Sequence, residues 1–171
     1  MNQSMNQRDM FFKWLYYAGA VLLLVLAQSL VLNCISVWAV HPFLPPVIAG
    51  IMAMLEGPAE GAVFGGIFGL LCDLTMPGVI PCFYTLAFLA AALPAAMIAK
   101  RLLSQGFLCA VLCAALALVI TDLLHTVLLT FRQGVELSAA LSLTGRELAV
   151  TVVLSPLVYL LLRSVHNRIL R

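Results

Sequence analysis

Apolar segments separated by short polar stretches make up most of the chain. Six of them can be delimited, at 14–33, 43–55, 59–75, 82–99, 107–131 and 147–163. Most are close to the roughly 20 residues that a helix needs to cross the hydrocarbon of a bilayer. The pattern therefore predicts an all-α integral membrane protein with six transmembrane segments, which form a single domain over residues 1–171.

The second and third segments are shorter than the others. At a rise of about 1.5 Å per residue they reach only about 20 and 25 Å. They are joined at Glu56-Gly57-Pro58, where Pro58 suits the first turn of a helix and Glu60 suits its positive end. The two segments either cross the membrane as thin spans or form a re-entrant hairpin, and the pattern leaves both possibilities open.

A regular row of small residues follows this hinge. The row consists of Gly57, Gly61, Gly65 and Gly69, with Gly66 beside it and Asp73 one further step along. Residues four apart on an α-helix are offset by only about 40°, so the row stays on one face. In a membrane, small residues let a second helix approach closely enough for extensive van der Waals contact. The row predicts a tight contact between helices, a groove for a specific partner with Asp73 as its polar anchor, or both.

The basic residues set the predicted orientation. With six segments and the amino terminus inside the cell, seven basic residues lie in the cytoplasm and two outside, as the positive-inside rule requires. The cytoplasmic set is Arg8, Lys13, Lys100, Arg101, Arg163, Arg168 and Arg171, and the outer set is Arg132 and Arg146. A single crossing by 43–75 would place only four of the nine inside. Both termini are therefore predicted to be cytoplasmic.

The composition agrees with a membrane protein. Hydrophobic residues make up 64% of the chain and charged residues only 9%, with a mean hydropathy of +1.11. Soluble domains usually contain about 25% charged residues, so a separate soluble domain is excluded. Basic residues do not alternate with aromatic ones, and we therefore expect no nucleic-acid binding.

Three ionisable side chains lie inside apolar segments, where burying a charge in the membrane costs free energy. Asp73, Asp122 and His125 are each expected to face the protein interior and to be paired, and Asp122 and His125 are one helical turn apart. In the six-segment topology all three lie toward the outer surface, so we predict an outward-facing polar cluster. Structural hydrogen bonding between helices explains it most simply. Partner or lipid recognition is the alternative, and catalysis or ion transport is a further one.

The sequence offers no complete catalytic or metal-binding set. The five cysteines include no CxxC pair, and Cys109 and Cys113 are interpreted as packing residues on one helix face. A disulfide between Cys34 and Cys82 is conceivable. We predict no catalytic residue, no metal site and no cofactor, and hence a protein that is not an enzyme.

One stretch resembles a known family. Residues 56–74 read EGPAEGAVFGGIFGLLCDL, a Pro/Gly turn follows, the next helix ends at Lys100-Arg101, and the last helix reads VVLSPLVYLLLR. Together with the length and the six-segment layout, these features resemble the rod-shape-determining membrane protein MreD family of bacteria. The resemblance covers most of the chain.

The resemblance implies a fold similar to that of the substrate-capture subunits of energy-coupling-factor transporters. It also implies a non-enzymatic scaffold in the bacterial cytoplasmic membrane that belongs to the rod elongation complex, the elongasome, and helps to control cell shape and lateral peptidoglycan synthesis. The implied partners are the bitopic protein MreC, the elongation glycosyltransferase and transpeptidase, and the machinery linked to MreB. The alternative hypothesis is a vitamin-capture subunit of an energy-coupling-factor type transporter.

Overall fold

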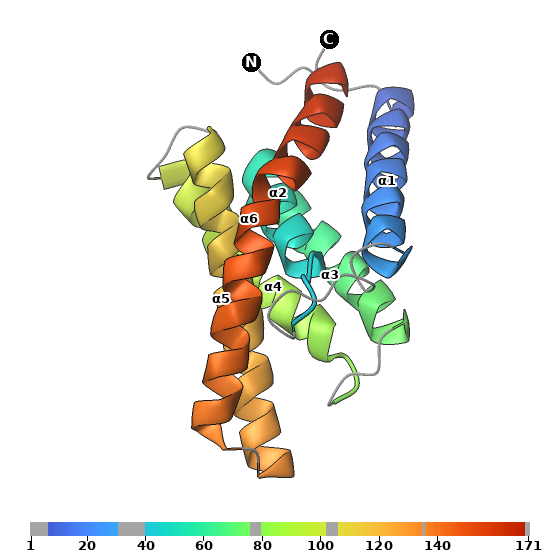
Figure 1. Cartoon of the computed structure of the whole chain (residues 1–171). Coiled ribbons are helices and arrows are strands. Elements are labelled where there is room, and N and C mark those ends of the chain that lie inside the picture. Colours follow the sequence, from blue (N-terminus) through green and yellow to red (C-terminus); the bar gives the residue numbers. More distant parts are fainter. Residues whose placement is uncertain (1–6, 31–39, 76–79, 102–105, 135, 170–171) are drawn as a thin grey trace.

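The computed structural model describes residues 7–30, 40–75, 80–101, 106–134 and 136–169, which contain helices and no strand. The helices are α1 (Gln7–Leu30), α2 (Pro45–Glu56), α3 (Pro58–Thr75), α4 (Phe83–Arg101), α5 (Phe107–Gln133) and α6 (Leu137–Ile169). Each helix overlaps one of the six predicted apolar segments (Figure 1). The prediction of an all-α protein is confirmed.

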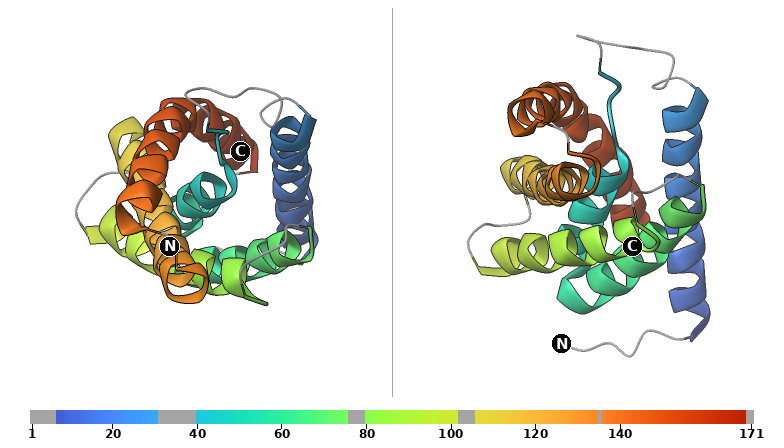
Figure 2. Two further views of the ribbon diagram at one scale, coloured as in Figure 1. Left: turned by 60° about the horizontal axis from the view of Figure 1, so that its bottom comes forward. Right: turned by 90° about the horizontal axis from the view of Figure 1, so that it is seen from below.

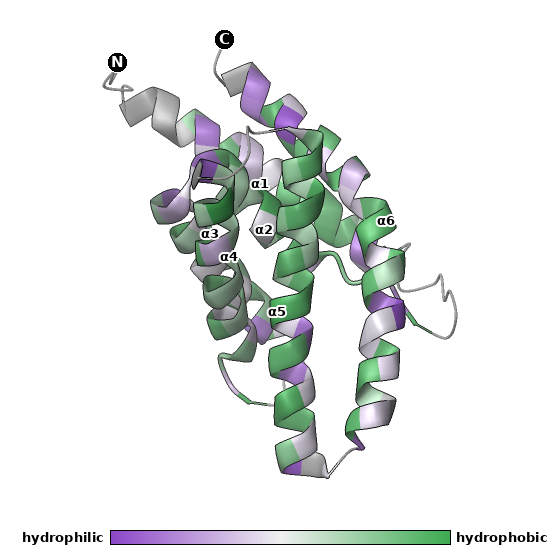
Figure 3. Cartoon of the chain, turned by 90° about the vertical axis from the view of Figure 1, so that its left-hand side faces the viewer, coloured by the Kyte–Doolittle hydropathy of each residue, from purple (hydrophilic) through white to green (hydrophobic). Residues whose placement is uncertain are grey.

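Four helices within the described residues are long and apolar enough to cross a membrane. Their apolar parts are Phe12–Leu30, Phe83–Lys100, Phe107–Arg132 and Ala140–Asn167, whereas Pro45–Glu56 is apolar but shorter. Figure 3 shows hydrophobic residues along most of each helix. The chain is therefore a multi-pass membrane protein. The six-span arrangement and the fold of the capture subunits stay predictions.

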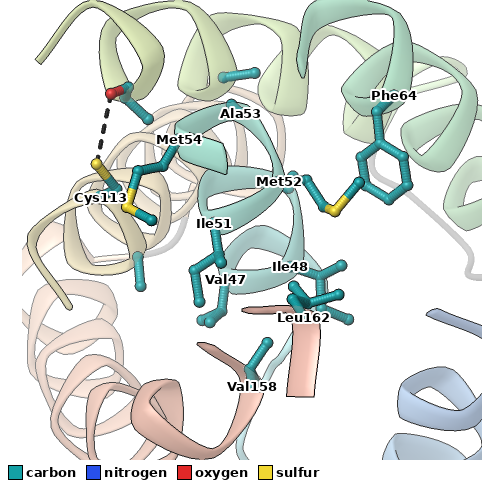
Figure 4. Packing of buried hydrophobic residues seen from close by; sticks show 14 of the residues in the cluster. Val47, Ile48, Ile51, Met52, Ala53, Met54, Phe64, Cys113, Val158 and Leu162 are labelled. Carbon is teal, nitrogen blue, oxygen red and sulfur yellow. Dashed lines mark hydrogen bonds between the residues drawn. The ribbon is translucent and has the colours of Figure 1, made fainter. Parts of the chain in front are cut away.

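Helix α2 forms the centre of the bundle. Every residue from Pro45 to Leu55 is buried, and α2 contacts α3, α4, α5 and α6 (Figure 2). A helix that is apolar on all sides needs apolar surroundings on all sides. Figure 4 shows Val47 and Ile51 on one side of α2, near Val158 of α6, and Met52 beside Phe64 of α3. Because protein surrounds α2, its length need not match the thickness of the bilayer.

The sixth helix differs from the prediction at its start. It begins at Leu137 and not at residue 147, so part of the stretch 132–146, between the last two predicted segments, is helical. This extension runs beside α5: the hydroxyl oxygens of Thr126 and Thr144 are 3.3 Å apart, and Ala140 is buried. Tertiary packing against α5 thus outweighs the mixed polarity of the sequence. The first segment also starts earlier than predicted, at Gln7, and its predicted end at 31–33 lies outside the described residues.

Candidate functional site

The glycine row of α3 packs against helices of the same chain. A Cβ atom added to Gly61 would lie 2.5 Å from Ala53 Cα of α2, and one added to Gly69 would lie 2.6 Å from Thr85 Cα of α4. At Gly65 the nearest atom would be the carbonyl oxygen of Phe88, at 3.3 Å. Real Cβ atoms hardly ever come within 3 Å of a backbone atom. The row thus allows α3 to approach both α2 and α4 closely.

The two remaining glycines of the row have other surroundings. Gly57 caps α2 with φ at +94°, a backbone conformation that favours glycine and turns the chain sharply between α2 and α3. A Cβ on Gly66 would only touch the Leu89 side chain at 3.7 Å. Since α2 and α4 fill the face of the glycine row, a partner helix would have to contact another face of α3.

Asp73 caps the amino terminus of α4. Its Oδ1 accepts a hydrogen bond from the backbone N–H of Tyr84 at 2.9 Å. Its Oδ2 accepts one from the N–H of Thr85 at 2.9 Å and one from the Thr85 hydroxyl at 2.7 Å. These backbone groups have no partner within their own helix, and a carboxylate also suits the positive end of the helix dipole. Asp73 therefore joins the end of α3 to the start of α4.

Asp122 and His125 line a separate small cavity together with an acidic residue of α6, Glu147. Asp122 is 7% exposed, and among the described residues its Oδ2 has no hydrogen-bond partner. The His125 ring lies 5.6 Å from the ring of Phe83. Asp73 does not line this cavity, although Tyr84, whose N–H it binds, does. The expected cluster is thus divided between a helix cap and a cavity.

A second polar group, absent from the sequence-based interpretation, joins four helices around Glu56. Its Oε1 accepts a hydrogen bond from the Tyr17 hydroxyl and lies 2.9 Å from His166 Nδ1, and its Oε2 forms an ion pair with Lys13. Lys13 also pairs with Glu60 at 2.8 Å. We call these five residues the Glu56 network. It places the beginning of α1, the α2–α3 hinge and the end of α6 at one end of the bundle.

The Glu56 network surrounds a nearly buried carboxylate with hydrogen-bond and ion-pair partners. The Glu56 side chain is only 6% exposed, and burial by itself would raise the pKa of this carboxyl group. Hydrogen bonds from His166, Lys13 and Tyr17 outweigh the burial and hold the pKa of Glu56 well below its usual range. The carboxylate is therefore ionised near neutral pH. Such a fully partnered group is suited to holding helices together.

Sequence periodicity could not find this network, but the predicted topology contained a signal for it. Lys13, the hinge at Glu56 and the end of the last segment were all assigned to the cytoplasmic side. Charges on different segments at a common depth are natural ion-pair partners in a membrane protein. Glu147 was missed for a different reason, because it stands at the first position of the predicted sixth segment and was treated as a boundary.

Helix α1 is held at its other end by Gln28, which is 4% exposed. The Gln28 side-chain amide donates a hydrogen bond to the carbonyl oxygen of Pro42 at 2.7 Å and accepts one from the N–H of Leu44 at 3.1 Å. Between Gln28 and the Glu56 network lies an apolar groove of about 820 Å³. We call it the α1–α3 groove, because α1 and α3 form its walls, with α2 at its base.

The walls of the α1–α3 groove are almost wholly apolar. On α3 the lining residues follow a helical stripe, Phe64, Ile67, Phe68, Leu71, Cys72 and Thr75. On α1 the wall includes the small residues Ala18 and Gly19. Ile67 and Leu71 are more than half exposed, so large apolar side chains face the open groove.

Comparisons with protein-family models, curated proteins and solved structures give no match. The resemblance to the MreD family therefore depends on the residues quoted above.

The described side chains do not form a metal site. Within this part of the chain no group of three His, Cys, Asp or Glu residues is placed to hold a metal ion. The buried Cys113 donates a hydrogen bond to the carbonyl oxygen of Ala95 at 3.4 Å (Figure 4). Its sulfur lies 3.9 Å from that of Cys109. Both cysteines thus lie in the packed core. Cys34 lies outside the described residues. The arrangement offers helix contacts, the α1–α3 groove and the acidic cavity beside Asp122.

Proposed function

We propose that the chain is a non-enzymatic scaffold of the bacterial rod elongation complex, related to the MreD family, in the cytoplasmic membrane. In this role it binds an MreC-like bitopic protein and assists the elongation glycosyltransferase and transpeptidase, together with the MreB-linked machinery. The quoted sequence resemblance supports the proposal. The single structural observation that carries it is the open α1–α3 groove, which suits a helix better than a reacting substrate.

The α1–α3 groove has the properties of a binding site for one transmembrane helix. Helices associate in lipid through close packing, for which small residues on one side are favourable. A Cβ added to Gly19 would meet no atom within 4 Å, so the space beside it is open. Gln28 and the Glu56 network fix α1 at both ends of the groove. The groove is thus a lasting feature of the bundle and is wide enough to admit apolar side chains from a partner.

The proposed orientation places the Glu56 network at the cytoplasmic surface and the α5–α6 turn outside. Cysteine labelling in intact cells tests this, after the native cysteines have been removed. Ser138→Cys, near the start of α6, should react with an impermeant reagent from outside. Ser164→Cys, near its end, should react only after the cells are opened. The reverse result would refute the orientation.

A photo-crosslinking experiment tests the groove. A photoreactive amino acid at Ile67, which lines the groove and is 58% exposed, should form an adduct with the MreC-like protein. The matched control is Val153 of α6, which is 75% exposed and does not line the groove. Equal adducts at both positions, or none at Ile67, would contradict the proposed site.

A substitution that fills the groove gives a second test. Gly19→Leu should leave the fold intact, because the added atoms enter open space, yet it should reduce recovery of the MreC-like protein about tenfold or more. Gly145→Leu is the control, since Gly145 also has open space around it but lies on α6. Recovery of a vitamin and an ATPase module in place of wall-synthesis proteins would favour the capture-subunit alternative.

A further inference from the structure

The cavity beside Asp122 differs from the rest of the interior in its charge. Two carboxyl groups, Asp122 of α5 and Glu147 of α6, line one space of about 110 Å³. No Lys or Arg is among the described residues that line it, and His125 is the one lining residue there with a basic side chain. Two carboxylates around one cavity repel each other unless a positive charge or a shared proton lies between them. The two acidic groups outnumber the single basic group, so the cavity favours a cation.

The Asp122 carboxylate provides an independent sign that a ligand is missing from this site. Asp122 is 93% buried, since its exposed fraction is 7%, and its Oδ2 has no hydrogen-bond partner among the described residues. Buried polar atoms almost always have a partner, so an exception requires an explanation. In the Glu56 network and at Asp73 the same chain pairs its carboxylates with several donors. The unpaired oxygen thus belongs to a residue that lines this cavity.

The remaining walls of the cavity suit an organic cation. The rings of Phe43, Phe83 and Tyr84 line it, and the Tyr84 ring lies 5.9 Å from that of Phe43 and 5.2 Å from that of Phe83. Aromatic faces attract ammonium groups that have left water. Thr121 also lines the cavity, and its hydroxyl donates to the carbonyl oxygen of Ala117 at 2.9 Å, which leaves its oxygen as an acceptor.

The size of the cavity limits the ligand. Its volume of about 110 Å³ is well below the roughly 300 Å³ at which pockets for drug-sized ligands begin. A neighbouring cavity of about 290 Å³ shares Phe43 and Glu147 with it and is lined by Gln28, Val40, His41, Pro42 and Leu143. The small cavity could thus hold a charged head group while the neighbouring cavity holds what is attached to it.

We propose that Asp122 and Glu147 bind an alkylammonium group, with the aromatic rings of Phe43, Phe83 and Tyr84 around it. The group belongs either to a small free amine or to the head group of phosphatidylethanolamine. The ammonium donates hydrogen bonds to the two carboxylates and to the Thr121 oxygen. No covalent step is involved. This site is distinct from the α1–α3 groove and does not depend on the proposed scaffold function.

The test uses the full chain in lipid nanodiscs. In discs of phosphatidylglycerol alone, methylammonium and ethanolamine are titrated, and binding is measured by calorimetry and by the midpoint of thermal unfolding. Uncharged molecules of similar size serve as ligand controls. In a second set of discs, phosphatidylethanolamine replaces part of the phosphatidylglycerol, with phosphatidylcholine as the lipid control. Saturable binding of a free amine identifies a small-molecule ligand, and stabilisation by phosphatidylethanolamine alone identifies the lipid.

Charge-neutral variants locate the site. Asp122→Asn and Glu147→Gln should each weaken binding about tenfold or more, because each removes a charged hydrogen-bond acceptor. Glu136→Gln, an exposed residue before α6, should leave binding unchanged. The proposal is overturned if neither the amines nor phosphatidylethanolamine binds the wild-type protein, or if the uncharged controls bind as well. Equal affinity in the wild type and both variants would also overturn it.

Discussion

The Glu56 network and the cavity at Asp122 treat buried acidic groups in opposite ways. Around Glu56, side chains from α1 and α6 supply donors to both carboxylate oxygens. Beside Asp122, a second acidic residue lines the space and Oδ2 has no partner in the part of the chain that is described. Removing one member of a paired buried charge destabilises the fold, because its partner is left buried without a counter-charge. An unpaired buried carboxyl oxygen lowers stability, so its presence favours a binding role. The difference suggests that one end of the bundle is built for stability and the other for recognition.

The largest expected effect is at Glu56. Glu56→Leu would leave Lys13 and His166 without their buried partner, so we expect a loss of about 3–5 kcal/mol in the free energy of unfolding. Chemical unfolding in detergent, followed by tryptophan fluorescence or circular dichroism, measures it. Glu136→Leu, at an exposed acidic residue, is the control. A loss below about 1 kcal/mol at Glu56 would remove the contrast between the two regions.

The next effect concerns the tight packing that adjoins the Glu56 network. Gly61→Ala places a methyl group 2.5 Å from Ala53 Cα, so α3 must move away from α2, at a cost of about 1–3 kcal/mol. Gly19→Ala is the matched control, because its added methyl group meets nothing within 4 Å. Thermal unfolding of both variants in the same detergent compares them. If the two behaved alike, the contact between α2 and α3 would be looser than described.

These two regions also show what the sequence could and could not predict. The six helices and the row of small residues follow from local spacing, because hydrophobicity and glycine periodicity are properties of single segments. The central position of α2 does not follow from local spacing, because the sequence of a short apolar helix is equally consistent with a short membrane span. The partners of Glu56 stand 39 and 110 positions away in Tyr17 and His166. Such pairings depend on tertiary arrangement, which periodicity does not report.

The start of α6 shows why the sequence did not predict the cavity beside Asp122. Starting the last segment at residue 147 made Glu147 a terminal residue at the membrane surface, whereas the helix in fact begins at Leu137. Glu147 therefore lies well inside a helix that packs along α5. A correct boundary would have placed it beside Asp122, and the acidic pair would have been evident. The mixed polarity of 132–146 concealed the extension, because packing against α5 stabilises it.

Asp73 lies between these two cases: both of its carboxylate oxygens accept hydrogen bonds, but only from the first turn of α4. Asp73→Asn keeps one acceptor oxygen, so we expect a loss of about 0.5–1 kcal/mol. Asp73→Leu removes all three hydrogen bonds to Tyr84 and Thr85 and should cost about 2 kcal/mol. Unfolding in detergent gives both values. A loss for asparagine as large as that for leucine would show that the charge itself, and not only the acceptor oxygens of the cap, is required.

The smallest effect on stability is expected at Asp122, and it separates the two regions most clearly. Asp122→Asn removes a charge that has no donor at Oδ2 among the described residues, so stability should change by less than about 0.5 kcal/mol or should rise. The corresponding change in the network, Glu56→Gln, removes a charge that Lys13 and His166 both contact and should lower stability markedly. Unfolding of the two variants side by side, without added amine and in the same detergent, measures the contrast. If Asp122→Asn were as destabilising as Glu56→Gln, Asp122 would have a structural partner, and the division between a stabilising and a recognising end would be wrong.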